Sequence, residues 1–373
     1  MEESGKLVKR SVNRRSLLKG GLLAGGAATL GAGLLGREVS AFAQTSSAAL
    51  NSGDIAILRF LAAAELIESD LWVQYAELGG IGTNPPPEVV PNPSLNPYQA
   101  ALSNLDGDGP QYITSNTLDE ISHATFLNGY LESKGADPVD LQEFAILPGS
   151  SATGSSGNSR ITNLLHLNVD TSWFVRYRST TNPDFGATYP QAITLKDVPA
   201  IPANDAILSG DANHIQAIAN IAAFHFGQIE QGGSSLYAAM SQKVSSPEVL
   251  QITLGIGGDE IAHFLEWVDF AGNGVQAPVA PFTDKKLGLT FPNFFSPLNP
   301  RIQPSLIFPV PAEFISPDLP RCATIRPLTD KFAGARAAAE GFIASGLFVG
   351  QTTGFYKALF ALADAADAAV RSC

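Results

Sequence analysis

Asp119-Glu120-Ile121-Ser122-His123 is repeated later in the chain, with one residue changed, as Asp259-Glu260-Ile261-Ala262-His263. In each copy the glutamate precedes the histidine by three positions, which on an α-helix places the two side chains one turn apart on the same face. Both side chains can then bind one metal ion, and a carboxylate together with an imidazole suits iron or manganese. The repeat therefore predicts two helices that bring matching ligand pairs to a metal centre.

The sequence around the repeat indicates four long helices. Apolar residues recur at helical spacing from about Asp54 to Leu78 without an internal Gly or Pro, and Gly79-Gly80 ends the segment. Ser246-Pro247-Glu248 is typical of a helix start, because Ser is a good N-cap and Pro fits the first helical position. The other three long helices are expected over about 115–134, 211–243 and 246–270.

The segments between these helices are unequal in length. Residues 79–110 and 136–210 form two long insertions, and the second contains the β-prone stretch 173–177. Residues 273–373 are expected to form a Pro-rich extension and an alanine-rich helix that is broken near 346–354. We therefore expect an all-α protein, with a four-helix bundle over 50–272 and the C-terminal helix packed on it.

The other two helices each offer a carboxylate. Glu65 lies on an apolar stripe, and Glu230 is the only acidic residue between Asp211 and Glu248. Glu68 is the alternative to Glu65, and Glu65 is favoured because its face is more apolar. A buried carboxylate is costly unless it is paired, so a metal ion would compensate for it. Trp72 and Tyr237, each seven positions after one of the two glutamates, could add a hydrogen bond to a ligand.

The order Glu65, Glu120-x-x-His123, Glu230, Glu260-x-x-His263 resembles the ligand pattern of ferritin-like di-iron and di-manganese proteins. Among such proteins, the chain more closely resembles the exported ferritin-like proteins that include the plant desiccation-related protein and fungal stress-response relatives. Their Glu-x-x-Glu motif followed by an aromatic residue looks like 65–68 with Trp72, although such families commonly have Tyr at that place.

The resemblance implies a site with two iron or manganese ions. Glu120 and Glu260 would bridge the ions, Glu65 and Glu230 would be terminal ligands, and each histidine would hold one ion. Positions open on the metals could take O2, peroxide or water. The implied function is redox or peroxide chemistry in oxidative or desiccation stress. The alternative is a non-catalytic stress-protection or cell-envelope protein on the same scaffold.

The N-terminal segment 1–43 has the order of a secretory signal. A basic stretch precedes a Gly/Ala/Leu-rich stretch, and Ala41-Phe42-Ala43 is a small-residue cleavage pattern. Asn13-Arg14-Arg15-Ser16-Leu17-Leu18-Lys19 resembles a twin-arginine signal. We therefore expect export by the twin-arginine machinery to the periplasm or the outside, with no stable membrane span after cleavage. A second copy of the chain, forming a homodimer, is a further candidate partner.

The amino-acid composition argues against several classes of protein. The chain is 45% hydrophobic, which argues against an intrinsically disordered protein. Its net charge of −12 makes nucleic acid an unfavourable partner. The two cysteines, Cys322 and Cys373, are too few for a zinc ribbon or an iron–sulfur cluster. In an oxidising compartment they could form a disulfide, and two free thiols are the alternative.

Overall fold

The computed structural model describes residues 50–81, 96–176, 190–294 and 334–372, together with a few positions between 309 and 323. Contacts divide the chain into two units, Met1–Ala49 and Leu50–Cys373, and the described residues belong to the second. The expected signal segment 1–43 and the side chains of Cys322 and Cys373, for which the sequence leaves both a disulfide and free thiols open, lie outside the described residues. Within the described part, no helix combines the length and the apolar character needed to cross a membrane.

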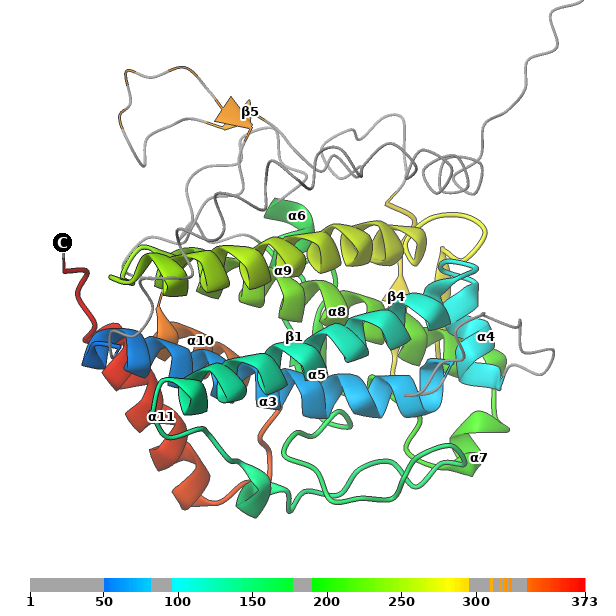
Figure 1. Ribbon diagram of the computed structural model, residues 1–373. Helices are drawn as coiled ribbons and strands as arrows, with labels where there is room; N and C mark the ends of the chain where they lie inside the picture. Colours follow the sequence, from blue (N-terminus) through cyan, green and yellow to red (C-terminus); the bar gives the residue numbers. More distant parts are fainter. Residues whose placement is uncertain are drawn as a thin grey trace, which may run out of the picture. The chain divides into compact units, whose positions relative to one another are not determined.

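The fold is mainly helical, as the sequence predicts, and four long helices form its centre (Figure 1). Their bounds agree with the expected ranges to within a few residues at most ends. These helices, which we call the four-helix core, are α3 (Ser52–Gly79), α5 (Gly109–Ser133), α8 (Ala212–Ser241) and α9 (Pro247–Asn273).

Local sequence explains where these helices begin. The Ser246 side chain accepts a hydrogen bond from the Val249 amide, so the predicted N-cap of α9 is confirmed. Helix α5 begins at Gly109, earlier than the expected start near Ser115. The reason is that Pro110 occupies the first turn, where its missing N–H costs nothing, and Gly109 allows the Phe270 ring to approach the backbone.

Neighbouring helices of the core run antiparallel. Helix α3 packs on α5, and Thr117 of α5 donates a hydrogen bond to the carbonyl of Trp72 on α3. Helix α8 packs on α9, and Ser241 near the end of α8 donates to Thr253 near the start of α9. The two pairs meet through buried side chains. For example, the Tyr75 hydroxyl of α3 is hydrogen-bonded to Nδ1 of His225 on α8. Side chains from all four helices therefore face a common interior.

The two insertions contain short ordered elements. The first holds α4 (Pro97–Ser103), which packs against α8. The second holds η2 (Gln142–Phe144), β1 (Leu167–Val169), α6 (Ser172–Arg176), β2 (Leu195–Val198) and α7 (Asp205–Leu208). Strands β1 and β2 pair antiparallel. Two further antiparallel pairs follow α9: β3 (Phe282–Asp284) with β4 (Leu289–Phe291), and β5 (Pro309–Val310) with β6 (Cys322–Ala323).

The β-prone stretch beginning at Trp173 is the helix α6, so the β expectation is wrong for this segment. Tertiary packing overrides the local preference here. The Trp173 indole lies directly against Gly227 of α8, where a Cβ would overlap its ring. Its Nε1 donates a hydrogen bond to the carbonyl of Phe224. The insertion is therefore anchored on α8 by a buried aromatic side chain.

The expected break in the C-terminal helix is present. It separates α10 (Ala335–Ala344) from α11 (Thr353–Asp367). Gly346 and Gly350, both with positive φ, lie in the break. Helix α11 packs on α3, and α10 packs on α8. The C-terminal region thus lies against the four-helix core.

Candidate metal centre

All six ligand candidates lie in the interior of the four-helix core. Each of them is at most 9% exposed, and three are fully buried. Helix α3 supplies Glu65 and α8 supplies Glu230, while α5 and α9 each supply one Glu-x-x-His pair. The helical spacing that the sequence indicated is what turns both members of each pair to the same side.

The six residues form two overlapping groups. In the first group one ligand atom each of Glu65, Glu120, His123 and Glu260 lies within 4.8 Å of the others. The second group consists of Glu120, Glu230, Glu260 and His263, and one ligand atom of each again lies within 4.8 Å of the others. Each group could hold a metal ion. Glu120 and Glu260 belong to both, which is the arrangement that two ions bridged by carboxylates require.

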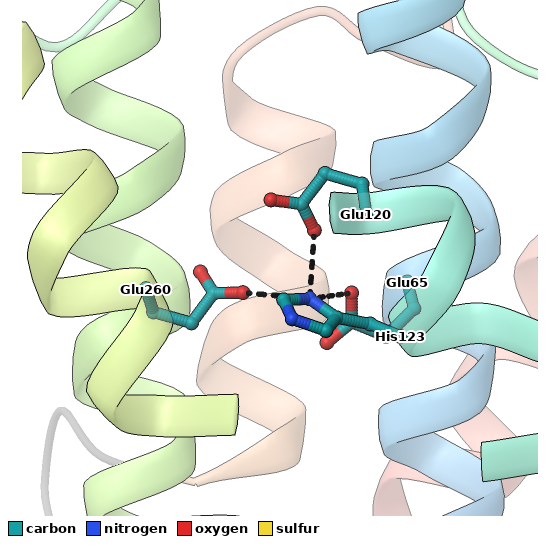
Figure 2. Close-up of side chains that lie close together, drawn as sticks. All are labelled: Glu65, Glu120, His123 and Glu260. Carbon is teal, nitrogen blue, oxygen red and sulfur yellow. Dashed lines mark ion pairs between the residues drawn. The ribbon is translucent and has the colours of Figure 1, made fainter. Parts of the chain in front are cut away.

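Figure 2 shows the first group, with His123 between three carboxylates from three helices. Its Nδ1 lies 3.4 Å from the nearest oxygens of Glu65 and Glu120, and 3.7 Å from Glu260. In the second group Nδ1 of His263 lies 3.1 Å from Glu120 and 3.3 Å from Glu230. In both groups the nitrogen that faces the carboxylates is therefore Nδ1.

The atoms that face one another in these groups are buried without hydrogen-bond partners. They are one oxygen each of Glu65, Glu120 and Glu230, both oxygens of Glu260, and Nδ1 of both histidines. Buried polar atoms in native proteins are normally paired, and leaving a carboxylate unpaired is costly. An unsatisfied set of carboxylate oxygens and imidazole nitrogens at one place fits divalent metal ions. The residues present therefore suit the group that the sequence indicates.

The outward nitrogen of each histidine contacts an aspartate of the opposite repeat. Nε2 of His123 lies 3.2 Å from Asp259, and Nε2 of His263 lies 3.3 Å from Asp119. Each aspartate therefore forms an ion pair with a histidine of a neighbouring helix, although both carboxylates remain partly exposed. Such a partner fixes the ring orientation and presents Nδ1 to a metal.

Hydrogen bonds to the carboxylates differ from those expected. The hydroxyl of Tyr237 on α8 donates to Glu65 on α3. Nε1 of Trp72 has no partner among the described residues, and its indole stacks on Trp267 instead. A tyrosine–glutamate hydrogen bond is thus present, but its tyrosine comes from α8 and its glutamate from α3.

Sequence reasoning missed Asn116. Its amide nitrogen donates to Glu120 at 2.9 Å and to Glu230 at 3.1 Å, and its oxygen accepts from Nε1 of Trp267 at 2.6 Å. Asn116 lies four positions before Glu120 on the same helix face, so the helical period could have found it. Trp267 lies seven positions after Glu260, the spacing that singled out Trp72 and Tyr237.

Gly233 of α8 lets a ligand approach the backbone closely. A Cβ at this position would lie 2.7 Å from the carboxyl carbon of Glu260, closer than real Cβ contacts come, and closer still to Oε2. The neighbouring Gly232 has open space where a Cβ would lie. The place of Glu260 in the centre therefore depends on the missing side chain at 233.

Glu68, the alternative to Glu65, is outside both groups. It is 2% exposed, and no described residue hydrogen-bonds its carboxyl group. Burial and the charges of Glu120, Glu65 and Glu230 raise its pKa well above the usual value. Glu68 is therefore close to the centre without taking part in its contacts.

Two of the ligand candidates, Glu120 and His123, have raised pKa values. Burial and the charge of Glu230 raise the pKa of Glu120 to about 8. Burial lowers the pKa of His123, but the nearby carboxyl groups of Glu120 and Glu65 outweigh it and raise the value to about 10. Metal ions compete with the protons that these groups hold, so metal binding must release them.

The remaining histidines have other partners. Nδ1 of His225 is hydrogen-bonded to Tyr75, and burial lowers the pKa of His225 to about 3. His214 pairs with Asp284, and the exposed His166 pairs with Asp197. None of the three belongs to the metal-ligand groups of the described residues.

Comparison of the chain with protein-family models, curated proteins and solved structures finds no match. The chemical interpretation of the centre therefore rests on its residues and their geometry.

Proposed function

We propose that the chain is an exported, ferritin-like protein whose four-helix core binds two iron or manganese ions for redox or peroxide chemistry. The observation that carries the proposal is the set of buried ligand atoms without hydrogen-bond partners, to which all six residues contribute. Glu120 and Glu260, which belong to both groups, are assigned as bridging ligands. Glu65 with His123, and Glu230 with His263, complete the two ends.

The chain's own residues prepare this centre in three ways. Asp259 and Asp119 hold the outward nitrogens of the histidines, so that Nδ1 is the nitrogen offered to a metal. Asn116 and Tyr237 orient carboxylates by donating hydrogen bonds to them. The apolar core around the ligands excludes bulk water, which strengthens electrostatic interactions at the centre.

Iron or manganese held by these residues would supply redox chemistry toward O2 or peroxide. The twin-arginine-like segment supports a site of action outside the cytoplasm, because that route carries proteins already folded around their metals. An oxidative or desiccation stress role follows from the resemblance of the ligand pattern.

The test is an activity assay on metal-loaded protein. We expect O2 consumption with the ferrous form, or peroxide decomposition with the manganese form, and loss of either in Glu120→Ala/Glu260→Ala. Glu248→Ala is the matched control, since Glu248 pairs with Lys134 on the outside of the core. A metal-loaded protein that is inert toward both O2 and peroxide would support a non-catalytic stress-protection protein instead.

A further inference from the structure

A pocket of about 180 Å³ lies between α8 and α10 beside the candidate metal centre. Glu68 of α3 lines it, together with Gly232 and Gly233 of α8 and Gly341 and Phe342 of α10. The volume is slightly larger than that of an apolar cavity known to hold a benzene molecule, about 150 Å³. The pocket is thus large enough for a small organic molecule and too small for a peptide.

The pocket borders the centre through Gly233. This glycine lines the pocket, and its backbone also lies against the carboxylate of Glu260. Because residue 233 is a glycine, it has no side chain to separate the pocket from the metal centre. Glu68 also lies about one helical turn after Glu65 on α3, which places the pocket's carboxyl group close to the ligands.

Glu68 is the unusual group in this pocket. Other polar lining groups have partners within the chain: Gln228 accepts from the amide of Asp170, and Ser235 accepts from Gln231. Glu68 is only 2% exposed, and no described residue forms a hydrogen bond with its carboxyl group. A buried carboxyl group without a partner is costly, so an occupant that donates a hydrogen bond would stabilise it.

The lining also indicates the chemistry of the occupant. Most of its surface is apolar, from residues such as Ile229, Leu236 and Phe342. It contains two acidic residues and no Lys, Arg or His, which disfavours an anion. Glu68 belongs to none of the groups of metal-ligand residues, which disfavours a metal ion at this place.

We propose that this pocket binds a small, mainly apolar molecule whose hydroxyl or amine group donates a hydrogen bond to Glu68, and that it holds a substrate beside the two metals. The substrate role rests on the proposed metal centre, whereas binding in the pocket does not. The class is that of small phenols and aromatic amines, which match both the volume and the single polar group.

Calorimetric titration of the metal-loaded protein with phenol tests the proposal, with toluene as a probe of the same shape without the hydroxyl group. We expect saturable binding of phenol at one site per chain, about fivefold tighter than toluene, the factor that one net hydrogen bond provides. Glu68→Leu removes this preference and Glu68→Gln retains it. Equal binding of both probes to the wild-type protein would overturn the role of Glu68.

Two variants place a larger side chain at the lining of the pocket, one on α8 and one on α10. A Cβ at Gly232 or at Gly341 meets no atom within 4 Å, so leucine at either position extends into open space. We expect Gly232→Leu and Gly341→Leu to weaken phenol binding at least tenfold. Gly255→Leu is the matched control, because Gly255 is a glycine of α9 with equally open surroundings and does not line the pocket.

Metal content, measured on the same samples, separates this proposal from the proposed function. Two metals per chain with no saturable phenol binding would overturn the pocket proposal and leave the metal centre standing. Phenol binding that is lost in both filled variants, in a protein that takes up no metal, would support the pocket as a binding site and overturn its substrate role together with the metal centre.

Discussion

Replacing Gly233 by alanine should remove metal from the centre without unfolding the protein. The added Cβ would lie 2.7 Å from the carboxyl carbon of Glu260, whereas ordinary contact begins at 3.4 Å, so the carboxylate must retreat by at least about 0.7 Å. Metal–ligand distances tolerate about 0.2 Å. A bridging carboxylate moved this far can no longer bind both ions.

The structure also sets the size of the effect. Without metal, the Glu260 carboxylate is the end of a flexible side chain and can rotate away, while alanine in a helix gains about 1 kcal/mol over glycine. With metal, we expect an affinity at least about 100-fold lower. At a metal concentration 100 times the wild-type Kd, stabilisation by metal would then fall from about 2.7 to about 0.4 kcal/mol.

The assay compares thermal unfolding with and without added Mn²⁺, together with metal content after dialysis. Gly232→Ala is the matched control, because its Cβ meets open space on the same helix turn. We expect the control to keep the wild-type metal-induced rise in Tm and Gly233→Ala to lose most of it. A Gly233→Ala protein that retains two metals at wild-type affinity would refute the assignment of Glu260 as a bridging ligand.

Three further predictions concern the ligands and their partners. Asp119→Asn and Asp259→Asn should each lower metal affinity about 10- to 100-fold in equilibrium dialysis, since they loosen the histidine rings, and unchanged affinity would contradict that role. Tyr237→Phe should destabilise the metal-free protein by about 1–3 kcal/mol in urea unfolding, because a buried carboxylate loses its donor; a neutral effect would argue against this hydrogen bond. Because the pKa of Glu120 is raised to about 8 and that of His123 to about 10, both groups stabilise the metal-free fold most at acid pH. Its stability should therefore fall as pH rises from about 5 to 10, and a flat profile would contradict the protonated centre.

The predictable part of the centre is the part encoded within single helices. The three-residue spacing of Glu120 and His123 fixes their common face, because the helical period is a local property. The apolar surroundings of Glu65 likewise favoured it over Glu68, and the structure brings Glu65 into the first group.

Contacts between helices were not predictable in the same way. The bond from Tyr237 to Glu65, and the one from Asn116 to Glu230, join residues far apart in the chain. Their register depends on how whole helices pack, which no local period specifies. The helix at Trp173 shows the same limit, because contact with Gly227 decides its structure against its β preference.

The central claim is tested most directly by locating metal in a crystal of the purified protein, with anomalous diffraction at the iron and manganese edges. The account predicts two peaks, both bridged by Glu120 and Glu260, with Nδ1 of His123 bound to one and Nδ1 of His263 bound to the other. It would be contradicted by no peak in the core after loading with either metal. Asp119, Asp259 and His263 form a third group that could hold an ion, and a single peak there would contradict the account equally.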